Sequence, residues 1–498
     1  MGFPQPERWA SVLRRSLVTS VAVVVVLLLA ACGSQLDPQT VANAGGQQGG
    51  DGALNADAGL GGDTGAGPAG DAGAGPGGTG GPGGTGGTGS TGGTGDGSGS
   101  TGGTGGSNGG KGGATGGAKA ASCDGFKNQT GVTDDKIVIA NASDISGPVP
   151  GIFEATQQAV RAYVEFFNSQ GDVCGRKLEV LNLDSRADAG ADQQAYAKAC
   201  DEAFAAVGSM SAFDSGGAGV AQGCGLPDIR AVATSSERGS CSTCFATYAT
   251  QPDLVPDSYA KWFLKEYPDA AAHVGVLYIN AGAAPENVKY QSDVWERAGW
   301  GVDYVQGIDV AEFNFAPYVQ QLKDKGIKMV IYTGPYQNTV KLQQAMQQQG
   351  YDPDVYMQDP TIYDGRYVSQ AGSLADNVFV YSTTDLFENK SNPEMQTYLS
   401  WLQQVKPGAI PNYYGLYAWS AARLFVEKAI ALGGKLSRST MIAELKKTSG
   451  WTGNGLHVPQ NVGGRTTSPC TSVIKYSGGS WHKVSPGSYM CGHVVKAN

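Results

Sequence analysis

The cysteines are the residues of this chain best suited to chemistry, because thiols can pair, bind zinc or exchange electrons. The chain has nine of them. Two, in Cys241-Ser242-Thr243-Cys244, have the C-x-x-C spacing of redox and zinc-binding motifs. One such pair is half of a zinc site, and neither a second pair nor a nearby His completes it. We therefore favour a structural role for Cys241 and Cys244 over a redox or metal-binding one.

Cys32 belongs to the segment that opens the chain. Three Arg precede the apolar run Val21–Ala31, and small residues stand before Cys32, which is the layout of a secretory signal. The run is shorter than the ~20 residues that span a bilayer, so a permanent transmembrane helix is disfavoured. Leu29-Ala30-Ala31-Cys32 resembles the lipobox of bacterial lipoproteins, whose Cys is lipidated and becomes the first residue. An ordinary signal peptide with an incidental Cys is the alternative, and Arg14-Arg15 leaves the export route open.

This signal predicts that the rest of the chain is extracytoplasmic and held at the bacterial cell membrane by a lipid on Cys32. An even number of cysteines in an exported protein indicates disulfides, and eight remain when Cys32 is set aside. We predict that Cys470 pairs with Cys491 and that Cys174 pairs with Cys200. The partners of the others stay open: Cys123, Cys224, Cys241 and Cys244.

No group of residues predicts catalysis. G-x-S-x-G, H-E-x-x-H and phosphate-loop motifs are absent, and the carboxylates form no recognisable acid–base pair. His273 opens an apolar run and the other three His lie near the C-terminus. The net charge of -9 supplies no basic surface for nucleic acid. We therefore expect a protein that is not an enzyme, with no catalytic residue, cofactor, metal or nucleic-acid partner.

A glycine-rich stretch from Gly45 to Lys119 follows the signal and holds about half of the 76 glycines. It has no aromatic residue and cannot build a core, so we expect a flexible tether over 32–122. Its functional interpretation is a spacer between membrane and folded domain, and low-complexity drift is the alternative. The remaining residues, 123–498, are long enough for two lobes.

Short apolar strands alternate with helical patterns through this globular part. Strands are predicted at Lys136–Ala140, Leu178–Leu183, His273–Ile279, Met329–Thr333 and Val378–Tyr381, and helices at Gly151–Ser169 and Ala191–Ala206. Alternation of this kind predicts an α/β fold with parallel sheets flanked by helices. Ligands of such sheets bind beyond the carboxyl ends of the strands, so the loops that follow the strands are where a site is expected.

Several stretches, in order from Gly131 to Lys475, resemble the type I periplasmic binding proteins, and above all the branched-chain amino-acid-binding proteins of ABC importers. The stretches that carry the resemblance are Gly131–Ile137 (GVTDDKI), Asp144–Pro148 (DISGP), Phe166–Asn168 with Gly175–Leu178 (GRKL), Phe315–Lys323 (FAPYVQQLK) and Tyr414–Trp419 (YGLYAW).

This resemblance implies two α/β lobes joined by three crossing strands, which close on a small solute like a hinge. The first lobe would take residues 123–250 and 386–450, and the second 251–385 and 451–498. The closed form would then dock on an ABC permease in the membrane. The signal peptide would be residues 1–31.

In relatives, hydroxyls and backbone N–H groups of the first lobe hold the ligand carboxylate. The resemblance places Ser146 in the first ligand loop, Ser211 near a Ser run, and Ser235 and Ser236 at a second donor loop. Capping of the local backbone by Ser211 and turn formation by Ser235 and Ser236 are the alternatives. Ala212 and Phe213 depart from the relatives' pattern, which counts against a simple amino-acid ligand.

In the second lobe the resemblance implies that Tyr336 walls the pocket and that Asp359 accepts the ligand ammonium. A cap or solvated turn is the alternative for Asp359. Phe153, Phe213, Tyr363 and Tyr414 are further candidates to line the pocket, although most aromatic side chains in such a chain are core. The loop Ile279–Pro285 lacks the aromatic–glycine pair of relatives, which again indicates a different ligand.

The function predicted from the sequence is capture of a small solute for an ABC importer by a monomeric lipoprotein. The solute classes that fit are an amino acid, an amide such as urea, or a small aromatic or carboxylic acid. A ligand sensor that acts on a separate signalling partner is the alternative, and a structural envelope protein is a third.

Overall fold

The structure is a computed structural model, and it describes residues 120–248 and 251–498. The predicted signal segment 1–31, Cys32 and the tether as far as residue 119 lie outside the described residues. Among the helices that are described, none is long and apolar enough to cross a membrane.

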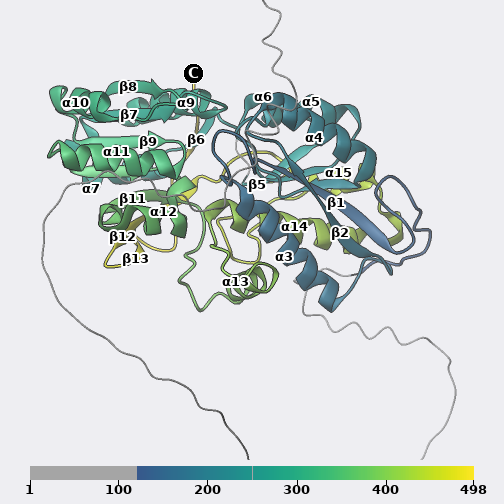
Figure 1. The fold of residues 1–498 in the computed structure, drawn as a ribbon. Helices are drawn as coiled ribbons and strands as arrows, with labels where there is room; N and C mark the ends of the chain where they lie inside the picture. Colours follow the sequence, from purple (N-terminus) through teal and green to yellow (C-terminus); the bar gives the residue numbers. More distant parts are fainter. Residues whose placement is uncertain (1–119, 249–250) are drawn as a thin grey trace, which may run out of the picture. The chain divides into compact units, whose positions relative to one another are not determined.

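The first sheet has five strands in the order β2-β1-β3-β4-β5, and every pair is parallel (Figure 1). Its strands are β1 (Lys136–Ser143), β2 (Lys177–Asp184), β3 (Ala205–Val207), β4 (Asp228–Val232) and β5 (Cys244–Tyr248). Parallel strands need crossover connections, which here are helices that cover the sheet. The helices of this lobe are α3 (Glu154–Gln170), α4 (Ala189–Glu202), α5 (Ser215–Gly223), α6 (Ser236–Ser240), α13 (Pro393–Val405), α14 (Tyr413–Leu432) and α15 (Arg438–Leu445).

The second sheet follows the order β13-β12-β11-β10-β9-β7-β8, with β14 paired to β12. Strands β7 to β11 are parallel, whereas β12 and β13 are antiparallel. Its strands are β7 (Val274–Ile279), β8 (Val302–Ile308), β9 (Met329–Thr333), β10 (Val355–Gln358), β11 (Val378–Ser382), β12 (Cys470–Ser477), β13 (Ser480–Lys483) and β14 (Met490–Cys491). The helices of this lobe are α7 (Ser258–Glu266), α8 (Pro268–Ala271), α9 (Ala284–Ala298), α10 (Ala316–Asp324), α11 (Tyr336–Gln348) and α12 (Gly365–Ala371).

The chain passes between the two sheets three times. It leaves the first sheet after β5, and β6 (Leu254–Pro256) pairs with the C-terminal β15 (Val494–Lys496). It returns after β11 to supply α13 and α14, both of which pack on α3, and crosses again before β12. The predicted α/β fold with two lobes of helix-covered, largely parallel sheets is therefore confirmed.

One helix was predicted to extend beyond its end in the structure. The pattern predicted a helix over Ala191–Ala206, but α4 ends at Glu202 and Ala205–Val207 form β3. Residues 203–207 are all buried, and β3 lies between β1 and β4. An alanine run favours a helix by propensity, and here burial in the centre of a sheet overrides that propensity.

Four disulfides tie the described chain. They join Cys123 to Cys174, Cys200 to Cys224, Cys241 to Cys244 and Cys470 to Cys491. The Cys470–Cys491 prediction is confirmed, since the two residues pair across β12 and β14. The Cys174–Cys200 prediction is wrong. Cys174 lies in the turn after α3, next to the segment that carries Cys123, whereas Cys200 of α4 faces the end of α5, where its Cα is 6.1 Å from that of Cys224.

We predict that peptide mapping of the non-reduced protein finds these four pairings and few free thiols. A Cys174–Cys200 peptide, or several free thiols among the eight cysteines, would contradict the fold. Mapping after full reduction and refolding in oxidising buffer is the matched control, because it shows whether the pairing is the one the fold selects.

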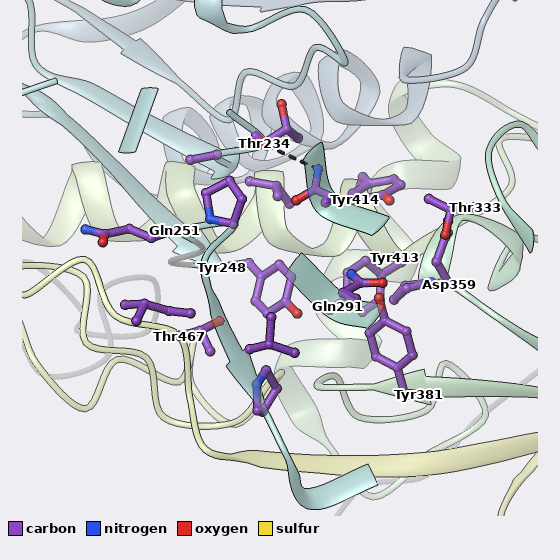
Figure 2. Close-up of a pocket in the computed structure, with 18 of the residues that line it drawn as sticks. Thr234, Tyr248, Gln251, Gln291, Thr333, Asp359, Tyr381, Tyr413, Tyr414 and Thr467 are labelled. Atoms are coloured by element: carbon purple, nitrogen blue, oxygen red, sulfur yellow. Dashed lines mark hydrogen bonds between the residues drawn. The ribbon is translucent and has the colours of Figure 1, made fainter. Parts of the chain in front are cut away.

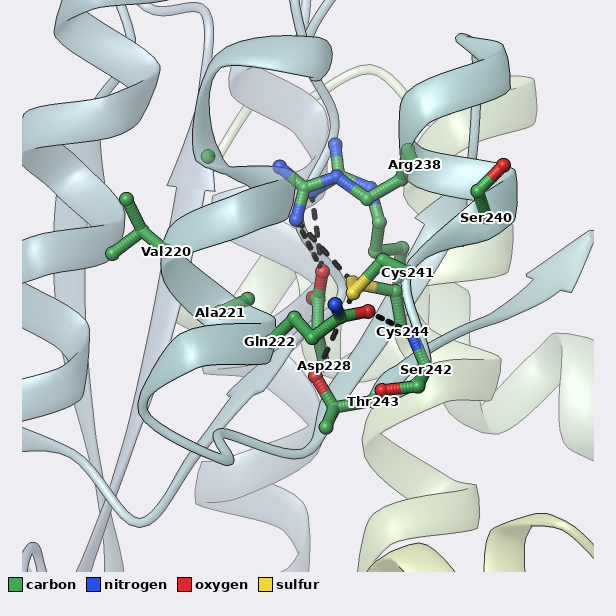
Figure 3. The surroundings of a disulfide bond; sticks show 12 residues. Val220, Ala221, Gln222, Asp228, Arg238, Ser240, Cys241, Ser242, Thr243 and Cys244 are labelled. Carbon is green, nitrogen blue, oxygen red and sulfur yellow. Dashed lines mark hydrogen bonds and ion pairs between the residues drawn. A yellow bond between two sulfur atoms is a disulfide. The ribbon is translucent and has the colours of Figure 1, made fainter.

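A buried network of charges lies beside the Cys241–Cys244 disulfide (Figure 3). Arg238, in α6, is 2.9 Å from Asp228 and 3.0 Å from Asp192, and all three side chains are fully buried. Arg230 extends the network, at 3.7 Å from Asp228 and 3.6 Å from Asp214. Its guanidinium also donates to the hydroxyl of Tyr196. These contacts fix α6 and the loop before it, which carries Ser235, against the sheet.

His457 is a second buried titratable group. Its Nδ1 lies 2.8 Å from the carbonyl oxygen of Val458, so Nδ1–H donates, and Nε2 accepts from Ser420 Oγ at 2.8 Å. Burial lowers the pKa of His457 to about 4. The unfolded chain, with an ordinary His pKa, binds a proton at higher pH, so stability from this group is lost as pH falls from about 6.5 to about 4.

We expect wild type to lose about 2 kcal/mol of unfolding free energy from His457 between about pH 7 and pH 5. The variant His457→Gln keeps a hydrogen-bonding side chain that does not titrate, so it lacks this loss. Urea unfolding of both proteins at both pH values measures the difference. A stability gap between the two proteins that does not change with pH would contradict this assignment.

Candidate functional site

A cavity of about 140 Å³ lies between the two lobes, and five tyrosines are among the residues that line it (Figure 2). The first lobe contributes Tyr248 at the end of β5 and Tyr413 and Tyr414 at the start of α14. The second lobe contributes Tyr259 of α7 and Tyr381 of β11. We call this space the tyrosine cavity.

The rings of the tyrosine cavity hold one another in place. Tyr413 meets Tyr248 and Tyr414 edge-on, with centroids 5.9 and 5.5 Å apart. Tyr381 stacks on Tyr259 at 4.6 Å. Figure 2 shows the rings of Tyr248 and Tyr381 beside the side chain of Gln291. Because each ring packs on another, the aromatic walls are preformed.

A second cavity of about 160 Å³ adjoins the first, and we call it the alanine cavity. Both share Asp359, Tyr414 and Thr234, which makes them neighbouring compartments of one cleft. Three alanines between the end of β7 and the start of α9 line it, in the segment where the sequence lacks the aromatic–glycine pair that the family resemblance led us to expect. These are Ala281, Ala283 and Ala284.

Asp359 is the one residue with a carboxylate that lines both compartments. It follows β10, is 9% exposed, and accepts a hydrogen bond from the backbone N–H of Thr361 at 2.7 Å. Burial raises its pKa to about 6. The described residues that line the two compartments include no Lys, Arg or His, so no positively charged side chain among them faces this carboxylate. A cation in the cleft would supply the missing charge.

Four of the residues predicted from the sequence line this cleft. Asp359 and Tyr414 line both compartments, and Phe153 and Phe213 line the alanine cavity. Phe153 packs edge-on against Tyr414, with centroids 5.2 Å apart. The structure thus brings these four together, and ligand contact by them stays a prediction.

The predicted serines have partners within the protein instead. Ser211 is fully buried and donates to Asp144 at 2.9 Å. Ser146 is exposed and donates to Asp184. Ser235 caps α6 and donates to Asp214, and Ser236 donates to Glu286.

Tyr336 begins α11 and is partly buried. The guanidinium of Arg366 lies over its ring, 5.4 Å from the centroid. Its neighbours Gly334 and Pro335 line the alanine cavity, whereas Tyr336 is not among the residues that line either compartment. A role for Tyr336 in ligand binding stays a prediction.

The two lobes touch at the rim of the cleft. Glu286 of the second lobe accepts from Ser236, and the amide of Asn287 donates to the carbonyl of Thr234 at 3.2 Å. On the other side, Arg366 donates to the carbonyl of Gly151 at 3.0 Å. These contacts join the two lobes beside the cavities, and a hinge motion that separates the lobes would break them.

Sequence reasoning missed most of the tyrosines and the polar residues that line the cleft. Tyr248 and Tyr381 lie at or next to the carboxyl ends of their strands, the position where the strand rule already placed the site. Thr234 lies one position before the predicted Ser235. Tyr259 carried no such signal, since it lies in the first turn of α7.

Within residues 120–248 and 251–498, no group of three or more His, Cys, Asp or Glu side chains is arranged to hold a metal ion. The residues that line the cleft offer hydrogen bonds, aromatic faces and the carboxylates of Asp144 and Asp359 to a bound molecule.

Comparison with known proteins places this geometry in a family. A family model described as periplasmic binding protein matches residues 136–471. Among solved structures, the branched-chain amino acid transporter substrate binding protein LivJ from Streptococcus pneumoniae, in complex with isoleucine, is 17% identical with a TM-score of 0.60. The match covers 71% of this chain and all of that one, 100%.

Two further solved structures carry other solutes in their descriptions. An ABC transporter solute binding protein from R. palustris, in complex with 4-hydroxybenzoate, is 18% identical with a TM-score of 0.59 and covers 73% of this chain and 98% of its own. A fatty acid ABC transporter substrate-binding protein from Thermomonospora curvata is 16% identical with a TM-score of 0.62. The match covers 76% of this chain and 97% of that one. A comparison with curated proteins found no match.

The fold and the cleft define a two-lobe binding protein. Because the family model spans more than half of the chain, the chain belongs to the type I periplasmic binding proteins. Members of this family are substrate-binding proteins, and their solved relatives include ABC transporter components. At identities below a fifth, the structural likeness itself shows the shared fold.

Proposed function

We propose that this protein captures a small solute between its two lobes and delivers it to an ABC importer. The observation that carries the proposal is the pair of adjoining cavities, which are lined by residues from both lobes and flanked by hydrogen bonds between the lobes. A cavity built from two lobes can open and close by a hinge, which is how a solute would enter and leave.

The solute classes open to such a cleft include an amino acid, an amide or a small organic acid. LivJ from Streptococcus pneumoniae holds isoleucine, and the R. palustris protein holds 4-hydroxybenzoate. The tyrosine-rich lining differs from a purely aliphatic pocket and favours a solute with a face that can pack on rings.

The proposal also states how the protein is attached to the membrane. Lipid on Cys32 would anchor the protein on the extracytoplasmic side of the cell membrane, with residues 1–31 removed as a signal peptide and 32–122 as a tether to a binding domain over 123–498. The protein would act as a monomer beside its permease. Mass spectrometry of the protein from membranes would show Cys32 as a lipidated first residue, and an unmodified Cys32 in a released protein would contradict the anchor.

A thermal-shift screen of the purified mature protein tests solute capture. The panel is amino acids, amides, amines, sugars and small acids. A solute at 100 times its dissociation constant stabilises a folded protein by about 2.7 kcal/mol, which raises the melting temperature visibly. We expect at least one class to do so in a dose-dependent way. A cooperative melt that no solute shifts, with no small molecule released on denaturation, would contradict solute capture.

A further inference from the structure

The serine hydroxyls that the family resemblance offers to a ligand are already used. Each of the four predicted serines donates to a carboxylate of the protein itself. A hydroxyl has one proton to donate, so a serine bound to an internal carboxylate has none left for a ligand carboxylate.

Asp144 accepts hydrogen bonds from the hydroxyl and backbone N–H groups of the first ligand loops. It is fully buried and lines the alanine cavity. Its oxygens accept from Ser185 Oγ at 2.7 Å, from Ala187 N at 2.9 Å, from Ser211 Oγ at 2.9 Å and from Ala212 N at 2.8 Å. This side chain thus occupies the set of hydroxyl and backbone donors that could otherwise hold an external carboxylate.

Asp214 likewise accepts the hydrogen bonds that the second donor loop could offer to a ligand. It accepts from the backbone N–H groups of Thr234 and Ser235, at 2.9 and 3.1 Å, and from the hydroxyl of Ser235. Arg230, which could have faced a ligand anion, is fully buried and lies 3.6 Å from Asp214. The hydroxyl and backbone donors that the two loops direct at Asp144 and Asp214 are therefore not free to bind a solute.

The cleft itself is lined by groups that suit a cation and not an anion. Asp144 and Asp359 both line the alanine cavity, and none of the described residues that line the two compartments is Lys, Arg or His. Tyrosine faces surround the compartment next to Asp359, with Tyr381 on the strand adjacent to the one that ends before Asp359. A carboxylate placed here would lie beside two like charges with no counter-ion, whereas an ammonium would gain a carboxylate and aromatic faces.

We infer that the solute is an organic cation, an amine without a carboxylate, held by Asp359 and the tyrosine rings. This inference rests on the proposed function and names the substrate class of the same cleft. The internal carboxylates of Asp144 and Asp214 act against amino acids, because they fill the donors that an amino-acid carboxylate would need. The ammonium donates to Asp359, and the apolar body of the amine packs on the rings.

Isothermal titration calorimetry with decarboxylated pairs tests the inference on the purified mature protein. The probes are tyramine against tyrosine, 3-methylbutylamine against leucine, and cadaverine against lysine, since each pair differs by a carboxylate alone. We expect the amine to bind about 100-fold more tightly than its amino acid in each pair that binds. An amino acid that binds as tightly as its amine would overturn the inference.

The wider solute panel separates this inference from the proposed function. If only neutral or anionic solutes of that panel bind, the inference fails while solute capture stands. If nothing binds, solute capture itself fails. An amine hit outside the three pairs supports the inference, provided that the matching carboxylated compound binds at least tenfold more weakly.

A pair of variants at Tyr381 tests the aromatic contribution. Tyr381→Phe keeps the ring and Tyr381→Leu removes it. We expect amine affinity within about threefold of wild type for Tyr381→Phe and at least about tenfold weaker for Tyr381→Leu. Circular dichroism and melting temperature show whether each variant folds. Equal affinities in two folded variants would overturn the role of the ring, and the paired titrations above apply whether or not Tyr381→Leu folds.

Discussion

Replacing Arg238 by Met is expected to cost about 3–5 kcal/mol of unfolding free energy. The guanidinium is fully buried between Asp192 and Asp228, at 3.0 and 2.9 Å. Met fills much of the same volume but leaves the buried Asp192 without its ion-pair partner and Asp228 with Arg230 alone. It also removes the hydrogen bond from Arg238 Nε to the carbonyl of Asp214 at 2.9 Å. Urea unfolding at neutral pH measures the loss.

Arg297→Met is the matched control for this prediction. Arg297 forms a pair of similar length with Asp293, at 2.6 Å, but its side chain is 41% exposed. Solvent screens such a pair, so we expect Arg297→Met to lose less than about 1 kcal/mol of unfolding free energy. An Arg238→Met variant within 1 kcal/mol of wild type would show that the network does not hold α6 against the sheet.

The cost of Arg238→Met should also shrink in acid. Burial raises the pKa of Asp192 to about 6 in the intact protein. Without Arg238 both carboxyls lose one of the positive charges that favour their ionised form, so they would take up protons at a higher pH than in wild type. The stability gap to wild type is therefore expected to narrow as pH falls towards about 6 and to level off below it, where both proteins take up the proton. A gap that widens would contradict this.

Replacing Asp359 by Asn is expected to weaken amine binding about 100-fold. Asn has nearly the same shape and can still accept from the N–H of Thr361, so the turn after β10 should persist. It carries no charge for the ammonium. Asp376→Asn is the matched control, because Asp376 is an exposed acid of the same lobe. The amine affinity of this variant should stay within twofold of wild type. Equal affinities for Asp359→Asn and wild type would remove Asp359 from the site.

The same carboxylate predicts how amine affinity depends on pH. Burial raises the pKa of Asp359 to about 6, and a cation binds the ionised form. Affinity is therefore expected to fall about tenfold between pH 7.5 and about pH 5 in wild type and to stay flat in Asp359→Asn. The titratable groups around Asp359 are Asp144 and three tyrosines whose pKa values burial raises, so the tyrosines stay neutral: Tyr332, Tyr381 and Tyr414.

The sheets were predictable because their strands are short apolar runs bounded by polar loops. Met329–Thr333 was predicted with the bounds of β9, and the run at Val378 with those of β11 to within one residue. The strand β3 was not predictable, since three small apolar residues after a helix carry no strand pattern. Its place is set by β1 and β4 on either side, which is a tertiary effect.

The candidate site was predictable in position and less so in chemistry. The resemblance pointed to Asp359, and Phe153, Phe213 and Tyr414 were among the aromatic residues expected to line the pocket. All four line the cleft. The partners of the serines could not be predicted. Ser211 and Asp144 are 67 positions apart, and only the fold brings them to 2.9 Å. A hydroxyl that looks available in the sequence is thus already bonded in the structure.

The account as a whole depends on a solute bound between the lobes, and a crystal structure of the purified protein with the tightest-binding solute of the panel tests that most directly. We predict density in the tyrosine and alanine cavities that contacts Tyr414 of the first lobe and Asp359 of the second, with an ammonium directed at Asp359. Density on an outer surface, or against one lobe alone, would contradict capture between the lobes.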